Sequence, residues 1–345
     1  MQLFSHDLGI DLGTSNILIY KAEEGIVARE PSVVAADKNT GKILKVGAAA
    51  RNMLGRTPGN VVAMHPLKDG VISDHEMTVQ MLQHLFRVAD RAALFSPKPR
   101  VIVSVPSGIT EVEERTVINA ALEAGARRVY LIEEPLAAAL GAGLDISGPR
   151  GHLVVDIGGG TTDIAVLSMN GVAAASSLKL AGNHFDEAIA RYIRRKYQVV
   201  IGQPTAEDIK IQIGSVYPRS GESSMVVKGR DAKAGIPREI TVTSTEICDV
   251  LARPARQIAD EVLSVLEDTS PELVGDIADT GIVLTGGCSQ ILGMDLLLQE
   301  RTGISCTIAD DPAACVAYGC GKSLSWITRM TEGPINLARK RLMRG

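Results

Sequence analysis

The sequence has few cysteines and no excess of positive charge. Its five cysteines all lie in the last third of the chain and include no Cys-x-x-Cys pair. This pattern indicates neither a disulfide framework nor a zinc site, and it fits a reducing cytoplasm. The formal net charge of -4 argues against broad nucleic-acid binding, so we expect no nucleic-acid partner.

Long apolar runs and low-complexity tracts are also absent. No apolar run is long enough to cross a bilayer, and the N-terminus lacks the charged-then-apolar pattern of a signal peptide. A content of 45% apolar and 22% charged residues is typical of a folded protein. We therefore expect a cytoplasmic protein whose membrane contact, if it has one, is peripheral. A chain of 345 residues favours two domains of similar size.

A glycine turn between two short apolar segments dominates the middle of the chain. Residues 152–157 predict a buried strand that carries Asp156 near its end, and a second strand follows at 162–167. Between them, Gly158, Gly159 and Gly160 allow a backbone to approach a bulky anion closely. With the hydroxyls of Thr161 and Thr162 they form a candidate phosphate cradle, in which Asp156 holds the waters of a Mg²⁺ ion. An ordinary glycine hairpin is the alternative.

The same pattern occurs near the N-terminus. An apolar segment leads to Asp11, then to a turn of Gly13, Thr14, Ser15 and Asn16, and a strand follows at 17–20. Two copies of one pattern favour a duplicated fold. We expect the two acid-bearing hairpins to face each other across a cleft and to hold the phosphates of a nucleotide from both sides.

The remaining segments indicate an α/β chain. Strands at 25–29, 33–36 and 43–46 form a small antiparallel sheet, and a short helix follows at 48–54. An alternation of strand and helix then continues to a breaker cluster at 147–149, which implies crossover connections. The later elements are helices at 183–197, 205–213, 244–267 and 313–329, strands at 223–228 and 236–243, and a strand, glycine turn and helix start at 281–289.

Three surface features allow alternative interpretations. Leu94 and Phe95 lie between a helix and a proline-rich, basic loop, where they either fold back onto the domain or insert into a lipid surface. The basic run Arg191, Arg194, Arg195 and Lys196 is interpreted as a solvated helix face rather than a nucleic-acid site. The basic C-terminal residues 336–345 are either a solvated tail or a weak partner for anionic lipid.

Four motifs together resemble the nucleotide-binding signature of the actin, heat-shock chaperone and sugar kinase superfamily. They lie at 9–14, 133–139, 156–163 and 284–287. Within this superfamily, the segments 30–35, 55–60, 66–72 and 205–210 are similar to the MreB/Mbl family of bacterial actin-like rod shape-determining proteins. The resemblance covers nearly the whole chain.

The resemblance implies an actin-like α/β fold of two duplicated, ribonuclease-H-like domains, each with a smaller subdomain, around a nucleotide cleft. Domain I would comprise 1–147 plus 314–345, with an antiparallel subdomain at about 33–65. Domain II would comprise 148–313, with a subdomain at about 184–249. The resemblance also implies a slow Mg²⁺-dependent ATPase. Its hydrolysis would act as a timer for a filament that lies under the membrane and guides peptidoglycan synthesis. The choice between ATP and GTP stays open.

Site residues carry over position by position. Gly13, Thr14, Ser15 and Asn16 would contact phosphates opposite the glycines at 158–160 and Thr162. Asp11 and Asp156 would hold the waters of Mg²⁺, and Glu134 would orient or deprotonate the attacking water with Thr161 as its companion. The remaining nucleotide contacts would be Glu207 and Lys210 on the ribose side and Gly286, Gly287, Cys288 and Ser289 on the adenine side.

The resemblance also implies partners. These are further copies of the chain, an anionic membrane surface, and proteins of the wall-elongation complex such as RodZ and MreC. The chain starts almost directly on its first strand, so we expect no N-terminal amphipathic anchor helix. Leu94 and Phe95 occupy the family's hydrophobic loop, which favours the membrane interpretation for them. We find no insertion that would supply a kinase substrate pocket, and no segment after Trp326 long enough for a chaperone's peptide-binding domain.

Overall fold

The computed structural model describes residues 7–89, 98–218 and 220–327. The predictions for Leu94, Phe95 and the basic C-terminal residues 336–345 lie outside these ranges. None of the helices in the described part combines the length and the apolarity that crossing a bilayer needs.

Two five-stranded sheets repeat one topology. The first has the strand order β10-β9-β1-β2-β3 and the second β13-β12-β11-β17-β18. In each sheet three consecutive strands pair antiparallel, and two later strands join in parallel beside the first of them. The repeat confirms the predicted α/β class and the duplicated halves. The strands are β1 (Leu8–Leu12), β2 (Asn16–Lys21), β3 (Gly25–Pro31), β9 (Arg100–Val105), β10 (Arg128–Glu133), β11 (His152–Ile157), β12 (Thr162–Ser168), β13 (Gly171–Leu178), β17 (Ile282–Thr285) and β18 (Cys306–Ile308).

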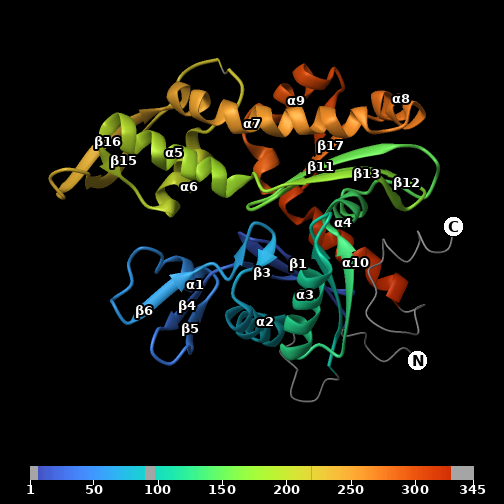
Figure 1. The fold of residues 1–345 in the computed structure, drawn as a ribbon, viewed down its shortest axis with the longest axis horizontal. Coiled ribbons are helices and arrows are strands. Elements are labelled where there is room, and N and C mark those ends of the chain that lie inside the picture. Colours follow the sequence, from blue (N-terminus) through green and yellow to red (C-terminus); the bar gives the residue numbers. More distant parts are fainter. Residues whose placement is uncertain (1–6, 90–97, 219, 328–345) are drawn as a thin grey trace.

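Each half also carries a smaller sheet. In the first half this sheet has the order β5-β4-β6, and in the second half β14-β15-β16. Figure 1 shows both at the same end of the molecule, on opposite sides of the gap between the halves. The elements are β4 (Val34–Asp37), β5 (Ile43–Val46), α1 (Ala48–Arg51), β6 (Val61–Met64), β14 (Val199–Val200), β15 (Ser224–Asp231) and β16 (Pro237–Thr243), with a two-stranded hairpin of β7 (Leu67–Lys68) and β8 (Val71–Ile72).

Helices cover both large sheets. α2 and α3 pack with the first sheet, and the longer set from α5 to α9 packs with the second (Figure 1). Apolar side chains at helical spacing, such as Met81, Leu82 and Leu85 on α2, supply the buried faces. The helices are α2 (His75–Ala89), α3 (Glu111–Glu123), α5 (Gly182–Tyr197), α6 (Gln203–Ile213), α7 (Ser244–Glu267), α8 (Pro271–Thr280) and α9 (Met294–Thr302).

Two further helices connect the halves. α4 (Glu134–Gly141) and α10 (Cys315–Ile327) lie between the sheets and share one buried core with residues of both, including Ile102 and Val154. The two helices touch at glycines: a Cβ on Gly319 would lie 1.8 Å from the carbonyl oxygen of Ala137. A side chain at that position would force the helices apart, so glycine allows the pair to hold the halves together.

The elements differ from prediction in several places. The sequence did not predict β6, β7, β8, β13, β14, α8, α9 or β18. The strand expected at 25–29 does not belong to the small sheet, because β3 pairs with β2 in the first large sheet. The helix expected at 48–54 ends at Arg51, and the segment after the 281–286 strand and turn is a 3₁₀ turn, Gly287–Gln290, rather than a helix start. The last helix begins at Cys315 because a second 3₁₀ turn, Pro312–Ala314, precedes it. Short elements such as β18 carry too few residues for a periodic signal, and their pairing partners are distant in sequence.

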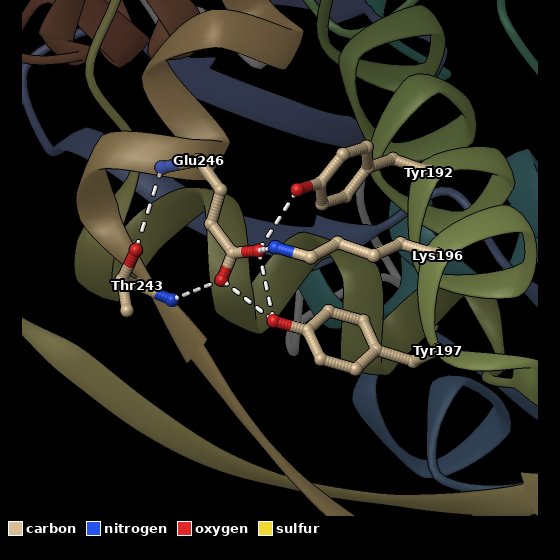
Figure 2. Close-up of polar contacts among 5 residues, drawn as sticks. All are labelled: Tyr192, Lys196, Tyr197, Thr243 and Glu246. Atoms are coloured by element: carbon tan, nitrogen blue, oxygen red, sulfur yellow. Dashed lines mark hydrogen bonds and ion pairs between the residues drawn. The ribbon is translucent and has the colours of Figure 1, made fainter.

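A carboxylate at the start of α7 ties that helix to the end of α5. Figure 2 shows Tyr192, Lys196 and Tyr197 of α5 converging on Glu246. Both tyrosine hydroxyls donate to Oε1 of Glu246 at 2.8 Å, and Glu246 forms a capping box with Thr243. Burial acts to raise the pKa of Glu246, but the hydrogen bond from Lys196 and the others lower it to about 2.

This cluster predicts a stability effect with a defined pH dependence. Glu246→Ala should lower the free energy of unfolding by about 2 kcal/mol, because the hydrogen bond from the Thr243 N–H and two tyrosine hydrogen bonds are lost. The folded-state pKa lies below the unfolded one, so the contribution is complete above about pH 5 and is lost as the pH falls. In urea unfolding, the difference in free energy of unfolding between the variant and the unmodified protein should therefore be smaller at pH 4 than at pH 7.

Glu239 provides the control for this experiment. It pairs with Lys228 on the surface, where its side chain is 62% exposed. Glu239→Ala should change stability by less than about 0.5 kcal/mol. Equal effects of the two substitutions, or a Glu246→Ala effect that does not change with pH, would contradict the assignment.

Candidate functional site

The two glycine turns meet in the space between the halves. The first turn joins β1 to β2, and the second joins β11 to β12. A Cβ on Gly159 would lie 1.9 Å from Oγ of Ser15, and a Cβ on Gly160 would lie 2.4 Å from Oγ1 of Thr14. Any side chain at these positions would collide with the opposing turn. The glycines therefore allow one hairpin to reach the other.

Two carboxylates stand beside the turns. Asp11 of β1 and Asp156 of β11 both line the cleft, and Asp156 Oδ1 accepts a 2.7 Å hydrogen bond from Thr285. Burial, and then the charge of Asp156, raise the pKa of Asp11 to about 8. Burial also raises the pKa of Asp156 to about 7, although the bond from Thr285 opposes it. Asp156 is buried and Asp11 is half-buried, and two carboxylates that line one cavity favour a cation beside them.

Glu134 adds a third acid to the same cleft. It is the first residue of α4 and is only 8% exposed. Burial, followed by the charges of Asp163, Asp156 and Asp11, raises its pKa well above the usual range. Asp163 lies fully buried on β12, and its Oδ1 accepts the backbone N–H of Ser107 at 3.0 Å. The sequence motif contained Asp163, but nothing in it indicated that Asp163 and Glu134 would be neighbours.

The lining of the cleft contains most of the residues singled out from the sequence. The cavity has a volume of about 250 Å³, far more than one water molecule needs. Those residues are Asp11, Gly13, Thr14, Ser15, Asn16, Glu134, Asp156, Gly158, Gly159, Gly160, Thr161, Glu207, Lys210, Gly286, Gly287 and Cys288.

Two of the singled-out residues do not line the cleft. The hydroxyl of Thr162 donates to the carbonyl oxygen of Leu180 at 2.7 Å. The hydroxyl of Ser289 donates to the carbonyl oxygen of Gly286 at 2.7 Å. Both side chains are buried, so here they fasten backbone around the cleft.

The structure also adds residues that the sequence did not indicate. Gly70, in the turn between β7 and β8, donates its N–H to Oγ1 of Thr14 at 3.0 Å, and a Cβ there would lie 2.9 Å from Cγ2 of Thr161. This third turn contacts both hairpins. In the sequence, the only signal of this turn was the adjacent pair Asp69-Gly70, which is typical of tight hairpins in general. In the structure both residues have positive φ.

The wall formed by α6 is held by two ion pairs. Lys210 Nζ lies 2.8 Å from Asp186 and donates to the carbonyl oxygen of Gly182, so its charge is balanced within the protein. Glu207 pairs at 2.5 Å with Arg51, which belongs to the small sheet region of the other half. The second pair bridges the two halves at the edge of the cleft.

The turn after β17 also lines the cleft, and its Cys288 lies close to Gly182 and Lys210. Gly286 has a φ of +82°, and a Cβ on it would lie 2.3 Å from the carbonyl oxygen of Ile157, so the turn fits closely against the second hairpin. Cys288 follows and is buried, and burial raises the pKa of its thiol. The thiol is therefore neutral and serves as packing surface.

Comparison with known proteins gives a consistent result. The family model described as MreB/Mbl protein matches residues 5–332. The cell shape-determining protein Mbl of Bacillus cereus is 50% identical over 96% of this chain and 99% of its own length. The cell shape-determining protein MreB of Escherichia coli is 49% identical over 94% of this chain and 95% of its own.

Solved structures show the same similarity. MreB5 of Spiroplasma citri bound to AMPPNP has a TM-score of 0.88 at 40% identity, over 93% of this chain and 96% of its own. The same protein bound to ADP has a TM-score of 0.89 at 41% identity, over 93% and 97%. The MamK double helical filament, at 22% identity and a TM-score of 0.76 over 94% and 99%, shares the fold. The predicted actin-like architecture is thereby confirmed.

The contact between the turns predicts a specific sensitivity. Gly160→Ala should lower the free energy of unfolding by about 1–3 kcal/mol, because its Cβ would overlap the side chain of Thr14 and push the hairpins apart. Gly148→Ala is the matched control, since a Cβ at Gly148 meets no atom within 4 Å. Thermal unfolding of both variants measures the effect, and equal melting temperatures would show that the turns do not depend on this contact.

Proposed function

Since the chain belongs to the MreB/Mbl family of cell shape-determining proteins, we propose that it is an ATP-dependent, filament-forming bacterial actin. In this proposal it lies at the inner face of the cytoplasmic membrane, directs peptidoglycan synthesis and maintains rod cell shape. The observation that carries the proposal is the meeting of two acid-bearing glycine turns, one from each half, in a single cleft.

The cleft suits a nucleotide whose phosphates lie between the turns. The hydroxyls of Thr14 and Ser15 and the side-chain amide of Asn16 would offer donors from one side, and the glycines at 158–160 allow close approach from the other. Glu207 would receive the ribose, with Lys210 anchored behind it, and the turn of Gly286 and Gly287 would face the base. The AMPPNP and ADP complexes of the Spiroplasma citri relative support this assignment.

A magnesium ion fits the chemistry of these donors. Mg²⁺ prefers oxygen ligands and keeps several of its waters, so one or two carboxylates suffice. Among residues 7–89, 98–218 and 220–327 no cluster of three acidic, histidine or cysteine side chains could hold a metal directly. In this proposal Asp11 and Asp156 would hold the ion through its waters, and the ion would neutralise phosphate charge. Burial raises the pKa values of both aspartates, so a cation beside them would favour their charged forms.

Glu134 is the residue placed to act on the attacking water. Its buried carboxyl group stands at the end of the cleft formed by the second hairpin, beside Thr161, which also lines it. Burial and neighbouring carboxylates raise the pKa of Glu134, and its ionised form would accept a proton from a water molecule and orient it. Positioning and charge neutralisation supply most of the catalysis in phosphoryl transfer, so a slow hydrolase needs no stronger base.

The connection between the halves supports a role for hydrolysis in assembly. Glu134 begins α4, and α4 packs against α10 at the core shared by both sheets. A change at the phosphates would therefore act on the helices that hold the halves together. We propose domain I as 1–147 plus 314–345 and domain II as 148–313. The packing of α10 on β1 and α4 supports this division.

Sedimentation tests assembly and turnover together. The purified protein should pellet in ATP and Mg²⁺ and stay in the supernatant without nucleotide. Glu134→Ala should still bind nucleotide but release phosphate at least about tenfold more slowly, since a positioned general base is lost. Glu123→Ala removes an exposed carboxylate on α3 and should match the unmodified protein. A monomer in every nucleotide state would overturn the filament assignment, and unchanged turnover would remove Glu134 from its role.

Membrane binding is the part of the proposal that depends on Leu94 and Phe95. Changing both to serine should abolish flotation with anionic vesicles, because their insertion would supply the apolar contact. Val112→Ser is the control, since Val112 is 73% exposed on α3. Undiminished flotation of the double variant would place the lipid contact elsewhere. RodZ, MreC and related elongation proteins belong to the proposal as partners by family resemblance.

A further inference from the structure

A groove with arginines on both rims runs between α5 and α7, outside the nucleotide cleft. We call it the arginine groove. Its volume is about 690 Å³. It is lined by Leu180, His184, Ala188, Arg191, Tyr192, Arg195, Asp249, Val250, Arg253, Pro254 and Gln257.

The groove gives part of the basic run on α5 a place in the structure. Lys196 is bound to Glu246, and Arg191 pairs with Glu187 on its own helix at 3.2 Å. Arg195 and, across the groove, Arg253 of α7 are exposed, and neither forms an ion pair within the described ranges of the chain. Two guanidinium groups on facing helices are thus available to a ligand.

The floor of the groove is apolar and only partly covered. Leu180, Ala188, Tyr192, Val250 and Pro254 are all half-buried. An apolar floor with a charged rim is the anatomy of a protein-binding surface. Aromatic and arginine side chains, both present here, dominate the energy of such surfaces.

Two features make the groove specific and rigid. Pro254 lies inside α7 and has no N–H, which removes the amide donor that an unbroken helix would supply to the carbonyl group of Val250. Both residues line the groove, so a backbone acceptor is offered there. Tyr192 is fixed by its bond to Glu246 (Figure 2), which holds one wall in place before any ligand binds.

We propose that the arginine groove binds an acidic peptide segment of a partner protein. Carboxylates of that segment pair with Arg195 and Arg253, where the planar guanidinium group matches a carboxylate in a two-bond geometry. Apolar side chains of the segment cover the floor, and one of its donors bonds the carbonyl group of Val250. A recessed floor between two helices suits a peptide better than a bilayer surface.

Fluorescence anisotropy with defined peptides tests this inference. The probe is a labelled 12-residue peptide of alternating glutamate and leucine, compared with the same peptide carrying glutamine in place of glutamate. The full chain should bind the acidic peptide and should bind the glutamine peptide at least about tenfold more weakly. The double variant Arg195→Glu with Arg253→Glu should lose at least about tenfold in affinity for the acidic peptide.

Arg194→Glu is the matched control. Arg194 is exposed on the same helix but does not line the groove, so this variant should bind within about twofold of the unmodified protein. Unfolding curves of all variants should coincide, which excludes a general loss of structure. Absence of acidic-peptide binding, equal binding of the glutamine peptide, or an equal loss in Arg194→Glu would overturn the proposal. Loss of anionic-vesicle flotation in the double variant, without peptide binding, would assign the groove to lipid instead.

Discussion

The contact between two glycine turns is the constraint on which the cleft depends. It brings Asp11 and Asp156, from strands in different sheets, into one cavity away from bulk water. Burial and mutual repulsion then raise the pKa of Asp11, which means that the protein alone does not stabilise these charges. In the proposed function, a cation and a phosphate chain in the cleft would offset the free-energy cost of holding these charges in place.

The same contact makes the cleft sensitive to the position of each half. The shared core of α4 and α10 joins the halves at one side of the cleft, and the Arg51–Glu207 ion pair bridges them at its edge. A partly exposed ion pair contributes little free energy by itself, so breaking it costs the fold little. Two halves that share a core on one side of the cleft and have a weak contact at its edge are suited to opening and closing around a ligand.

The outer surface of the second half is organised by a different carboxylate. Glu246 holds the end of α5 against the start of α7, and this spacing creates the arginine groove beside it. The proposed nucleotide site and the arginine groove share α5, whose first residue, Gly182, lines the nucleotide cleft. One helix thus touches both sites, although no movement of it is required for either.

The sequence by itself determined the local motifs of the two turns. The sequence predicted the two turns at 11–16 and 156–163, each with an acid, glycine and hydroxyls. It could do so because the residue preferences of strands and turns span only a few positions. It also determined the duplicated α/β class and most elements longer than a few residues. Only the tertiary structure decided that the turns touch, that Thr162 and Ser289 point away from the cleft, and that Lys210 is bound by Asp186. Arg51 and Glu207 are separated by 156 positions, and no local preference encodes a contact that depends on how two halves pack.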